Sequence, residues 1–481
     1  MNRTFVDELN QNVGKEVLVK GFVQERRDMG KIIFLSIKDC SGEIQSVVIP
    51  SNTEAYAVAK SVRTHWVLAV KGQINTRPDN QKKVEQENGE VELLIATIDV
   101  LNEALPSPID VSGDGYEIGE ESRLHYRYLD LRRPRMQRNM KKRAEASMFI
   151  RSFLRSHRFT EIDTPILTKT TPEGARDFLV PSRLHHGKFY ALPQSPQQYK
   201  QLLMVAGYER YFQFARCFRD ENARADRAFG EFTQLDMEMS FVTQEDILTL
   251  TEELFTKLVK TVFPDKHIKE GAWPRLSHLE AMRKYGTDKP DLRENKDDPD
   301  ELAFSWTVDF PLFTEQTDDD FFHGSGRSRF APSHHMFTAP HPDDIHLLDT
   351  DPTLVRGLQH DMILNGFEVG GGSIRIHSSA VQEKVFDLIG FTPEQKGSFS
   401  HMLEAFSYGV PPHGGIAPGF DRFLMAVLGE TSIHEILTFP MSNKGQTAVM
   451  EAPSGASKEQ LDELGIRLSK SLSTRSFLEN G

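Results

Sequence analysis

The segment FRDENARADRAFGEFTQLDMEMSFV, residues 218–242, constrains the fold of this chain more than any other stretch. Its second half alternates polar and apolar residues, which predicts a β-strand with two unlike faces, because successive side chains of a strand point to opposite sides. One face carries Phe232, Gln234, Asp236 and Glu238, and the other carries Thr233, Leu235, Met237 and Met239. We expect one face to pack and the other, with Arg219 at its edge, to bind a ligand. A ring, an amide and two carboxylates beside a guanidinium suit a phosphorylated planar molecule next to an ammonium group.

Size and charge limit the possible classes of protein. The chain has 481 residues, more than a single hydrophobic core usually holds, so we expect two or more domains. A net charge of −13 argues against a protein that coats nucleic acid through bulk charge, and leaves a local basic patch for any RNA contact. Cys40 and Cys217 match no metal or redox spacing and predict reduced thiols. We expect a cytoplasmic protein without a membrane segment, because no apolar run is long enough to span a bilayer and the N-terminus lacks a signal-peptide core.

Residues 14–101 contain short apolar runs separated by turn signals, which predict a small antiparallel barrel of about five strands. Two of these runs carry the polar and aromatic residues Arg26, Arg27, Phe34, Lys38 and Gln45. A basic, aromatic strand face of this kind binds single-stranded nucleic acid. The same residues also fit an ordinary barrel with solvated charges, and this region by itself favours neither reading.

The rest of the chain divides at two breaks. Residues 103–122 are rich in Pro, Gly and acidic residues, which predicts a linker or hinge. Apolar residues at helical spacing over 136–157 predict an amphipathic helix, after which strands and helices alternate irregularly, as is typical of an α+β domain. Residues 288–301 form a second break, acidic and proline-containing.

Three ordered segments resemble the signature motifs of the class II aminoacyl-tRNA synthetases, and in particular the bacterial type of aspartyl-tRNA synthetase. The segments are LRSHRFTEIDTPIL, FRDE followed by EFTQLDME, and GGIAPGFDRFLMAVLG. The resemblance runs from the barrel nearly to the C-terminus. It implies an α+β chain with an N-terminal five-stranded OB-fold barrel and a catalytic domain built on a mixed, mainly antiparallel sheet flanked by helices. The implied division is an anticodon-binding domain at 1–103, a linker or hinge at 104–130, and a catalytic domain at 131–481 with a short acidic connection near 288–301.

The implied reaction is ATP-dependent activation of L-aspartate to aspartyl-adenylate, followed by transfer of aspartate to the 3′ end of tRNA(Asp), with tRNA(Asn) as a second candidate acceptor. Attack of a carboxylate on the α-phosphate builds charge on phosphate oxygens, so fixed cations must lie there. By resemblance, the catalytic candidates are Arg219, at the α-phosphate, and Arg422, over the adenine. The remaining ATP-binding candidates are Asp220, Glu221 at the adenine edge, Phe232 stacked on the adenine, Glu368, Gly419, Phe420 and Asp421. An arginine in an RDE run more often forms a surface ion pair, but the accompanying motifs favour the nucleotide role.

A divalent metal accompanies the polyphosphate, and Mg²⁺ prefers a few carboxylates together with phosphate oxygens. Asp361 and Glu368 match the metal carboxylates of the family, although the same pair could be a solvated acidic pair.

The choice of amino acid depends on charge in the pocket. A carboxylate side chain demands buried cations, whereas a lysine substrate demands an acid. Lys200 and Arg375 supply two cations. By resemblance, the other residues of the aspartate pocket are Glu173, Ser195, Gln197 and Asp236, which hold the substrate ammonium, and either Asp177 or His334, which helps to close the lid. An asparaginyl enzyme is the enzymatic alternative, and a neutral amide would leave the two cations uncompensated. A catalytically inactive, synthetase-like RNA-binding protein is the alternative from another class.

In the barrel, the resemblance assigns anticodon contacts to Phe34 and Gln45, with Arg27 and Glu92 nearby. It also implies a homodimer built through the first motif.

The chain departs from the bacterial pattern in three places. The inserted domain of about a hundred residues that follows DKPDLR in bacterial relatives is missing, and we expect activity to survive because the motifs lie outside it. ADRAFGEF replaces ADRQPEF in the second motif and loses a glutamine that contacts ATP in the family. Pro418 stands in the third motif where a larger apolar residue is usual.

Overall fold

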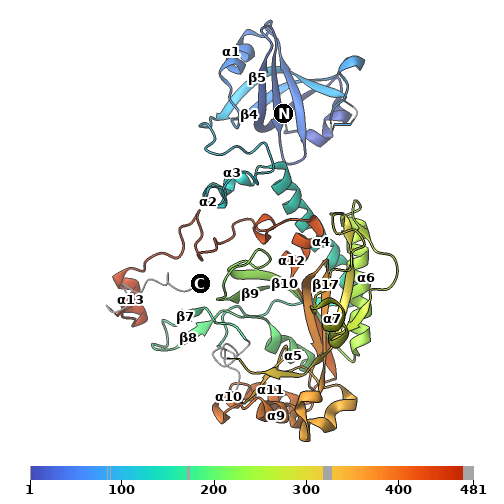
Figure 1. The fold of residues 1–481 in the computed structure, drawn as a ribbon. Coiled ribbons are helices and arrows are strands. Elements are labelled where there is room, and N and C mark those ends of the chain that lie inside the picture. Colours follow the sequence, from blue (N-terminus) through green and yellow to red (C-terminus); the bar gives the residue numbers. More distant parts are fainter. Residues whose placement is uncertain (1, 84, 87, 171–173, 318–327, 470–481) are drawn as a thin grey trace. The chain divides into compact units, whose positions relative to one another are not determined.

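The structure is a computed structural model that describes residues 2–83, 85–86, 88–170, 174–317 and 328–469 (Figure 1). The chain forms two compact units, Met1–Asp110 and Val111–Gly481, and each is described by itself.

The first unit is a closed five-stranded barrel with strand order β1-β2-β3-β5-β4. Its strands are β1 (Glu16–Asp28), β2 (Ile33–Lys38), β3 (Glu43–Val48), β4 (Val67–Thr76) and β5 (Val91–Asn102). Helix α1 (Thr53–Ser61) joins β3 to β4, and the short 3₁₀ helices η1 (Val6–Asn12) and η2 (Asp79–Gln81) complete the unit. Neighbouring strands are antiparallel except for β3 and β5, which pair in parallel. The predicted five-stranded OB-fold barrel is confirmed.

The second unit is built on an eight-stranded sheet with the order β12-β14-β17-β18-β19-β10-β9-β6. Its strands are β6 (Thr160–Glu161), β9 (Arg210–Arg219), β10 (Gly230–Ser240), β12 (Arg275–Ser277), β14 (Phe304–Pro311), β17 (Arg356–Leu364), β18 (Phe367–Ile374) and β19 (His413–Pro418). The pairs at the two edges, β12 with β14 and β6 with β9, are parallel, and all the others are antiparallel. The predicted mixed, mainly antiparallel sheet is therefore confirmed.

Three helices pack against the sheet and form the main core with it: α4 (Pro134–Ser156), α6 (Gln244–Val262) and α12 (Phe420–Leu428) (Figure 1). Pro134 stands in the first turn of α4, where its missing N–H costs nothing. The amphipathic pattern of α6 explains its place, since Leu254 and Leu258 are fully buried in this core. The packing leaves the ends of β10, β18 and β19 accessible on the other face, where the candidate site lies.

The remaining elements are short. The helices are α2 (Glu120–His125), α3 (Arg127–Asp130), α5 (Gln197–Val205), α7 (His278–Tyr285), α9 (Ser379–Leu388), α10 (Pro393–Gly397), α11 (Ser400–Ser407) and α13 (Lys458–Leu464), with the 3₁₀ helices η3 (Pro342–Asp349), η4 (Pro352–Leu354) and η5 (Ile433–Glu435). The two-stranded sheets are β7 (Leu179–Pro181) with β8 (Phe189–Ala191), β11 (His267–Ile268) with β13 (Glu301–Leu302), and β15 (Phe313–Glu315) with β16 (Phe330–Pro332).

The linker predicted at 104–130 is too long. The boundary between the units falls at residue 110, and α2 and α3 belong to the second unit. Arg123, Arg127 and Asp130 are buried there. Composition misled the prediction because Arg123 and Arg127, which both pair with Asp130, also bind partners about 300 residues further along the chain, which no local pattern reveals.

The connection at the second break is short, as predicted. Helix α7 ends at Gly286 in a left-handed conformation, and residues 287–300 lead directly to β13. Within the ranges given above, no helix is long and apolar enough to cross a membrane.

Candidate active site

The candidate site is a cavity at the ends of β10, β18 and β19. The structure brings most of the predicted site residues into its wall. Those lining it are Ser195, Gln197, Lys200, Arg219, Glu221, Phe232, Asp236, His334, Glu368, Arg375, Gly419, Asp421 and Arg422. They come from segments spread over more than 200 residues of sequence, so the fold itself assembles the cavity.

Some predicted residues are placed differently. Phe420 is buried in the main core, where its ring meets Phe214 edge-on at 5.0 Å, because the first residue of α12 faces the sheet. Its ring therefore does not line the cavity, and its predicted contact with the nucleotide stays a prediction. Asp220 follows β9 and is not among the residues that line the cavity. Glu173 lies outside the described residues.

Strand β10 has the two faces that its alternation predicts. Leu235, Met237 and Met239 are buried in the core, whereas Phe232 and Asp236 line the cavity. The first half of this strand is also held by a side chain: the main-chain N–H of Thr233 donates to the Asp421 carboxylate at 2.8 Å. This bond ties β10 to the first turn of α12, which also carries Arg422.

A buried cluster of four charges forms the floor of the cavity. Lys200 Nζ lies 2.7 Å from Asp236 Oδ1 and 3.3 Å from Glu238 Oε2. Arg375 donates to the same Glu238 through Nε at 3.0 Å and Nη2 at 3.3 Å, and donates to Ser373 Oγ through Nη1 at 2.7 Å. None of the four charged residues is more than 2% exposed. Lys200 and Arg375 thus converge on one carboxylate of the protein, whereas the sequence analysis expects them to meet the carboxylate of the substrate.

Glycine makes room for that carboxylate. A Cβ at Gly415, on the neighbouring strand β19, would lie 2.2 Å from Glu238 Oε2. Burial by itself raises the pKa of Glu238, but Arg375 and Lys200 outweigh it and hold that pKa below its usual value. Burial raises the pKa of Asp236, and Lys200 only partly offsets this effect.

The nucleotide side of the cavity carries two arginines that differ in how fully their donors are hydrogen-bonded. The Arg219 guanidinium lies over the Phe232 ring, 5.2 Å from its centroid, and its Nε has no hydrogen-bond partner among the described residues. Arg422 is held firmly, because Nε donates to the Asp226 carbonyl at 3.1 Å and Nη1 to the Glu368 carbonyl at 2.8 Å. Arg219 is therefore the cation with donor capacity to spare.

Asp361 and Glu368 lie close together on paired strands. The β17–β18 register shifts between Met362 and Ile363, and this irregularity brings the two carboxylates to one place. A Cβ at Gly371 would lie 3.2 Å from Asp361 Oδ1 and 3.9 Å from Glu368 Oε1. Burial, and then the Glu368 charge, raise the pKa of Asp361 well above its ordinary value. No group of three or more His, Cys, Asp or Glu side chains suited to a metal occurs in the part of the chain that the structure describes. Two adjacent carboxylates fit a Mg²⁺ ion that takes its other ligands from phosphate and water.

Several residues of the site were not predicted, and three of them carry charge next to predicted residues. Glu238 stood on the binding face of the alternating segment, so its place could have been found there. Lys289, on the short connection after α7, reaches Glu368 Oε2 at 2.7 Å, and no local pattern points to it. Asp226, which pairs with Arg422 at 3.3 Å, lies in the altered loop of the second motif. His334 was predicted, and its burial, together with Arg375, lowers its pKa to about 4, so its imidazole is neutral at physiological pH.

The four predicted barrel residues lie together on one face. Arg27 Nη2 donates to Gln45 Oε1 at 3.3 Å, and Gln45 Nε2 donates to Glu92 Oε2 at 3.4 Å. The Arg27 guanidinium lies over Phe34, which it opposes in the β1–β2 register, 5.8 Å from the ring centroid. A ring, a guanidinium and an amide side by side can stack on and hydrogen-bond a base.

Two family models match the chain. Residues 119–443 match the tRNA synthetases of class II (D, K and N), and residues 17–101 match the OB-fold nucleic acid binding domain.

Curated relatives match nearly the whole chain. The aspartate–tRNA(Asp/Asn) ligase of Moorella thermoacetica is 39% identical, with 96% of each chain covered. The aspartate–tRNA ligase of Lysinibacillus sphaericus is 37% identical, with 96% of this chain and 98% of the relative covered. The alignment with the Moorella protein extends over 589 positions, more than the 481 residues of this chain, in agreement with the missing inserted domain.

Solved structures share the fold. The asparaginyl-tRNA synthetase of Pyrococcus horikoshii complexed with asparaginyl-adenylate matches with a TM-score of 0.72 and 23% identity, covering 92% of this chain and 98% of that one. The aspartyl-tRNA synthetase of Entamoeba histolytica matches with a TM-score of 0.70 and 22% identity, covering 92% and 91%.

The charge cluster predicts how stability depends on pH. Because the pKa of Glu238 is lowered in the folded protein, its ion pairs contribute stability above the unfolded pKa of about 4.5, and this contribution is lost as the pH falls through the lower folded value. We expect Glu238→Gln to reduce the free energy of unfolding at neutral pH by about 3 kcal/mol. The difference in unfolding free energy between this variant and the unaltered protein should become smaller in acid. Thermal melts followed by circular dichroism between about pH 7 and pH 3 measure this difference.

Glu231→Gln is the matched control. It removes a carboxylate from the same strand, but one whose ion pair with Arg216 is solvent-exposed. We expect it to change stability by less than about 0.5 kcal/mol. A stability difference between Glu238→Gln and the unaltered protein that stays constant with pH would contradict the lowered pKa of Glu238.

Proposed function

The chain belongs to the class II tRNA synthetases and, within them, to the aspartate–tRNA ligases, and we propose that it activates L-aspartate with ATP and transfers it to the 3′ end of tRNA(Asp). The observation that carries this proposal is the identity of 37% to 39% with aspartate–tRNA ligases over nearly the full length of both chains. The chemistry of the cavity is consistent with it.

The pocket charges by themselves do not separate aspartate from asparagine. Lys200 and Arg375 are already matched by Asp236 and Glu238, so the four charges sum to zero. A neutral amide would therefore not leave the cations uncompensated, contrary to the expectation from the sequence. The choice of aspartate depends on the relatives, together with the guanidinium face of Arg375, which can bind a carboxylate with two donors. Ser195, Gln197, Asp236 and Glu173 are the proposed partners of the substrate ammonium.

The proposed chemistry needs no general base. The α-carboxylate of aspartate is ionised at neutral pH, attacks the α-phosphorus of ATP, and displaces pyrophosphate. Arg219, with an unpaired Nε in the cavity wall, would meet the charge that develops on the α-phosphate oxygens. Phe232 would stack on the adenine, with Glu221 at its edge and Arg422 on its other face.

Magnesium is part of the proposal. Asp361 and Glu368 would hold the ion, which neutralises the polyphosphate when bound. Lys289 pairs with Glu368 in the structure and so compensates one carboxylate of the pair. Mg²⁺ bound there would take over that compensation.

The acceptor and the assembly complete the proposal. Arg27, Phe34, Gln45 and Glu92 are the proposed anticodon contacts, and tRNA(Asn) is a second acceptor because several relatives bear the name aspartate–tRNA(Asp/Asn) ligase. A cytoplasmic homodimer follows the family expectation. The apolar side chains of Met148, Ile166 and Leu167, at and beside the first motif, are 47% to 62% exposed and would be covered by a second copy.

Pyrophosphate exchange with aspartate, asparagine and lysine tests the function. We expect exchange with aspartate alone. Exchange with asparagine would establish the asparaginyl reading, and exchange with none of the three would favour an inactive RNA-binding protein. Charging of purified tRNA(Asp) and tRNA(Asn) then defines the acceptors, and light scattering of the same preparation tests the dimer.

Removal of the buried guanidinium should damage one substrate site selectively. We expect Arg375→Ala to raise the KM for aspartate about a hundredfold, because a charged hydrogen-bonded pair is worth several kcal/mol, and to change the affinity for ATP little. Arg219→Ala is the reciprocal variant and should act mainly on ATP. The double variant Arg375→Met with Glu238→Gln removes both charges, and so separates the lost contact from the effect of a stranded carboxylate. Equal losses for both substrates in Arg375→Ala would show that its role is misassigned.

The barrel assignment has its own test. We expect Phe34→Ala to raise the KM for tRNA about tenfold, because one base loses its stacking partner, and to leave pyrophosphate exchange unchanged. Phe5→Ala is the control, since Phe5 is another ring of this unit that lies beneath an arginine, Arg3 at 4.6 Å. Impaired adenylate formation in Phe34→Ala would contradict the assignment.

A further inference from the structure

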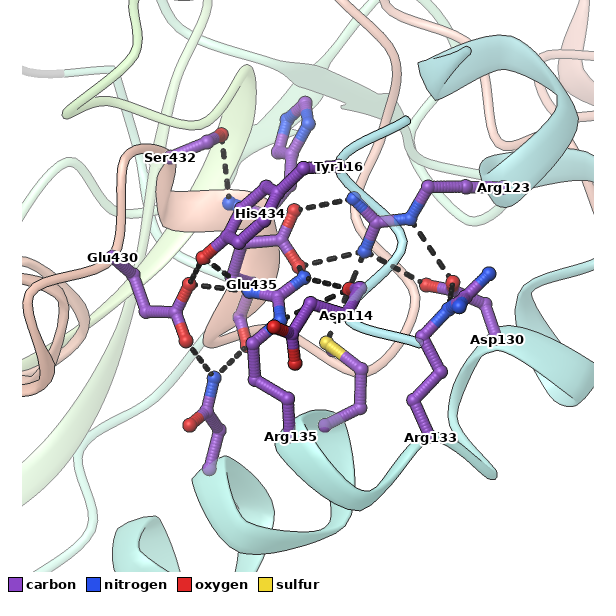
Figure 2. A network of polar contacts seen from close by, with 12 residues as sticks. Asp114, Tyr116, Arg123, Asp130, Arg133, Arg135, Glu430, Ser432, His434 and Glu435 are labelled. Atoms are coloured by element: carbon purple, nitrogen blue, oxygen red, sulfur yellow. Dashed lines mark hydrogen bonds and ion pairs between the residues drawn. The ribbon is translucent and has the colours of Figure 1, made fainter. Parts of the chain in front are cut away.

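A buried network of arginines and carboxylates lies in the second unit, apart from the residues assigned above to substrates (Figure 2). Four guanidinium groups, of Arg123, Arg127, Arg133 and Arg135, meet three carboxylates, of Asp130, Glu430 and Glu435. All seven residues are less than 9% exposed. Buried ion pairs of this kind usually add little net stability over apolar residues of similar size, so their value lies in the geometry that they impose.

The network fixes the segment by which the chain enters this unit. Arg133 Nη1 donates to the Gly113 carbonyl at 2.8 Å, and Arg135 donates to the Asp114 carbonyl through Nη2 at 2.9 Å and Nε at 3.1 Å. Tyr116 donates its hydroxyl proton to Glu430 at 2.8 Å, and its ring lies 4.1 Å beneath the Arg135 guanidinium (Figure 2). We call residues 113–116 the entry segment.

The same arginines fix the segment that follows α12. Arg135 pairs with Glu430 and, at 2.9 Å, with Glu435, while Arg123 reaches Glu435 at 2.7 Å. Arg127 donates to the main-chain carbonyls of His434, Leu437 and Thr438. Residues 430–438 therefore have little freedom to shift without breaking charged hydrogen bonds in a dry environment.

This second segment bears on the nucleotide. Ile433, in η5, lines the cavity, and its main-chain N–H donates to the Ala225 carbonyl at 2.9 Å. Ala225 lies in the loop 220–229, which carries Glu221 and the Asp226 that holds Arg422. A continuous set of contacts thus leads from the entry segment through Arg135 and η5 to the nucleotide-binding loop.

We propose that the arginine network is a positioning device that fixes the loop 220–229 over the nucleotide through the hydrogen bond from Ile433 to Ala225. Arg135 is the central positioning residue, because it alone among the described arginines of the network contacts both the entry segment and Glu430. The inference rests on the proposed nucleotide site, and not on which amino acid is activated.

Ile433→Pro tests the link directly. Proline removes the N–H donor, and residue 433 is the first residue of η5, a position that tolerates proline. Ser432 before it has φ −142° and ψ 144°, the extended conformation that a residue preceding proline adopts. Ile433→Val, which keeps the N–H and trims the side chain, is the control. We expect the proline variant to bind ATP about fivefold more weakly than the valine variant, the usual effect of one hydrogen bond.

Arg135→Lys tests the network. Lysine keeps the charge but cannot reach the entry segment, Glu430 and Glu435 together. Arg356→Lys makes the same substitution at another forked pair, with Asp344, that has no contact with the loop. We expect Arg135→Lys to raise the Kd for ATP about fivefold or more with the KM for aspartate nearly unchanged, and Arg356→Lys to change neither. Tyr116→Phe, which deletes only the hydroxyl, is the milder variant if Arg135→Lys does not fold, and should act in the same direction.

Isothermal titration with ATP in the absence of amino acid and tRNA is the measurement, so a failure to activate aspartate would not affect the outcome. If the network acts through Ile433, the double variant Arg135→Lys with Ile433→Pro binds ATP about as weakly as the weaker single variant, because the second change removes nothing further. Multiplied effects in the double variant would overturn the proposal. So would an Arg135→Lys protein that melts at a lower temperature yet binds ATP with the original Kd.

Discussion

The sharing of one buried carboxylate, that of Glu238, by Lys200 and Arg375 is the constraint on which the second unit depends. Two buried cations would each cost several kcal/mol if left unpaired, so the fold must supply anions within hydrogen-bond distance. Strand β10 supplies both, Glu238 and Asp236, at alternate positions. Gly415 on the adjacent strand leaves the space that the carboxylate occupies. The register of β10 with β19, the glycine at position 415 and the pairing of the buried charges are therefore required together.

The cavity has two halves with different electrostatics. The amino-acid half is balanced, because each buried charge already has a partner, and a ligand there must match an existing pattern of donors and acceptors. The nucleotide half contains Arg219, whose Nε has no hydrogen-bond partner among the described residues. Asp361 lies near Glu368 of the cavity wall, and its pKa is raised by burial and by the Glu368 charge. Arg219 can therefore bind a phosphate, and Asp361 can bind a cation. Lys289 already pairs with Glu368 beside Asp361, and a cation bound there would take over that pairing.

Sequence patterns predicted the elements that depend on residues close together in the chain. The alternation in residues 230–240 located both faces of β10, and short apolar runs located the barrel. Other features depend on partners distant in sequence. Residues 120–130 were taken for linker because Arg123 and Arg127, besides pairing with the nearby Asp130, are held by residues beyond 430. Phe420 was assigned to the nucleotide by its place in a motif, although the first turn of α12 turns it into the core. The charge balance at Lys200 was missed because Glu238 was counted as part of a face and not as a partner.

The grip of Arg133 and Arg135 on the backbone of residues 113 and 114 has a consequence for how such a chain can be recombined. An exchange of the barrel for another RNA-reading module, whether in evolution or in the laboratory, must join the parts upstream of this grip. A junction placed inside the helices that follow would divide a set of charges which function only together. The position at which the two parts can be joined thus lies before residue 113. This is some twenty residues before the end of the segment whose composition resembles a linker.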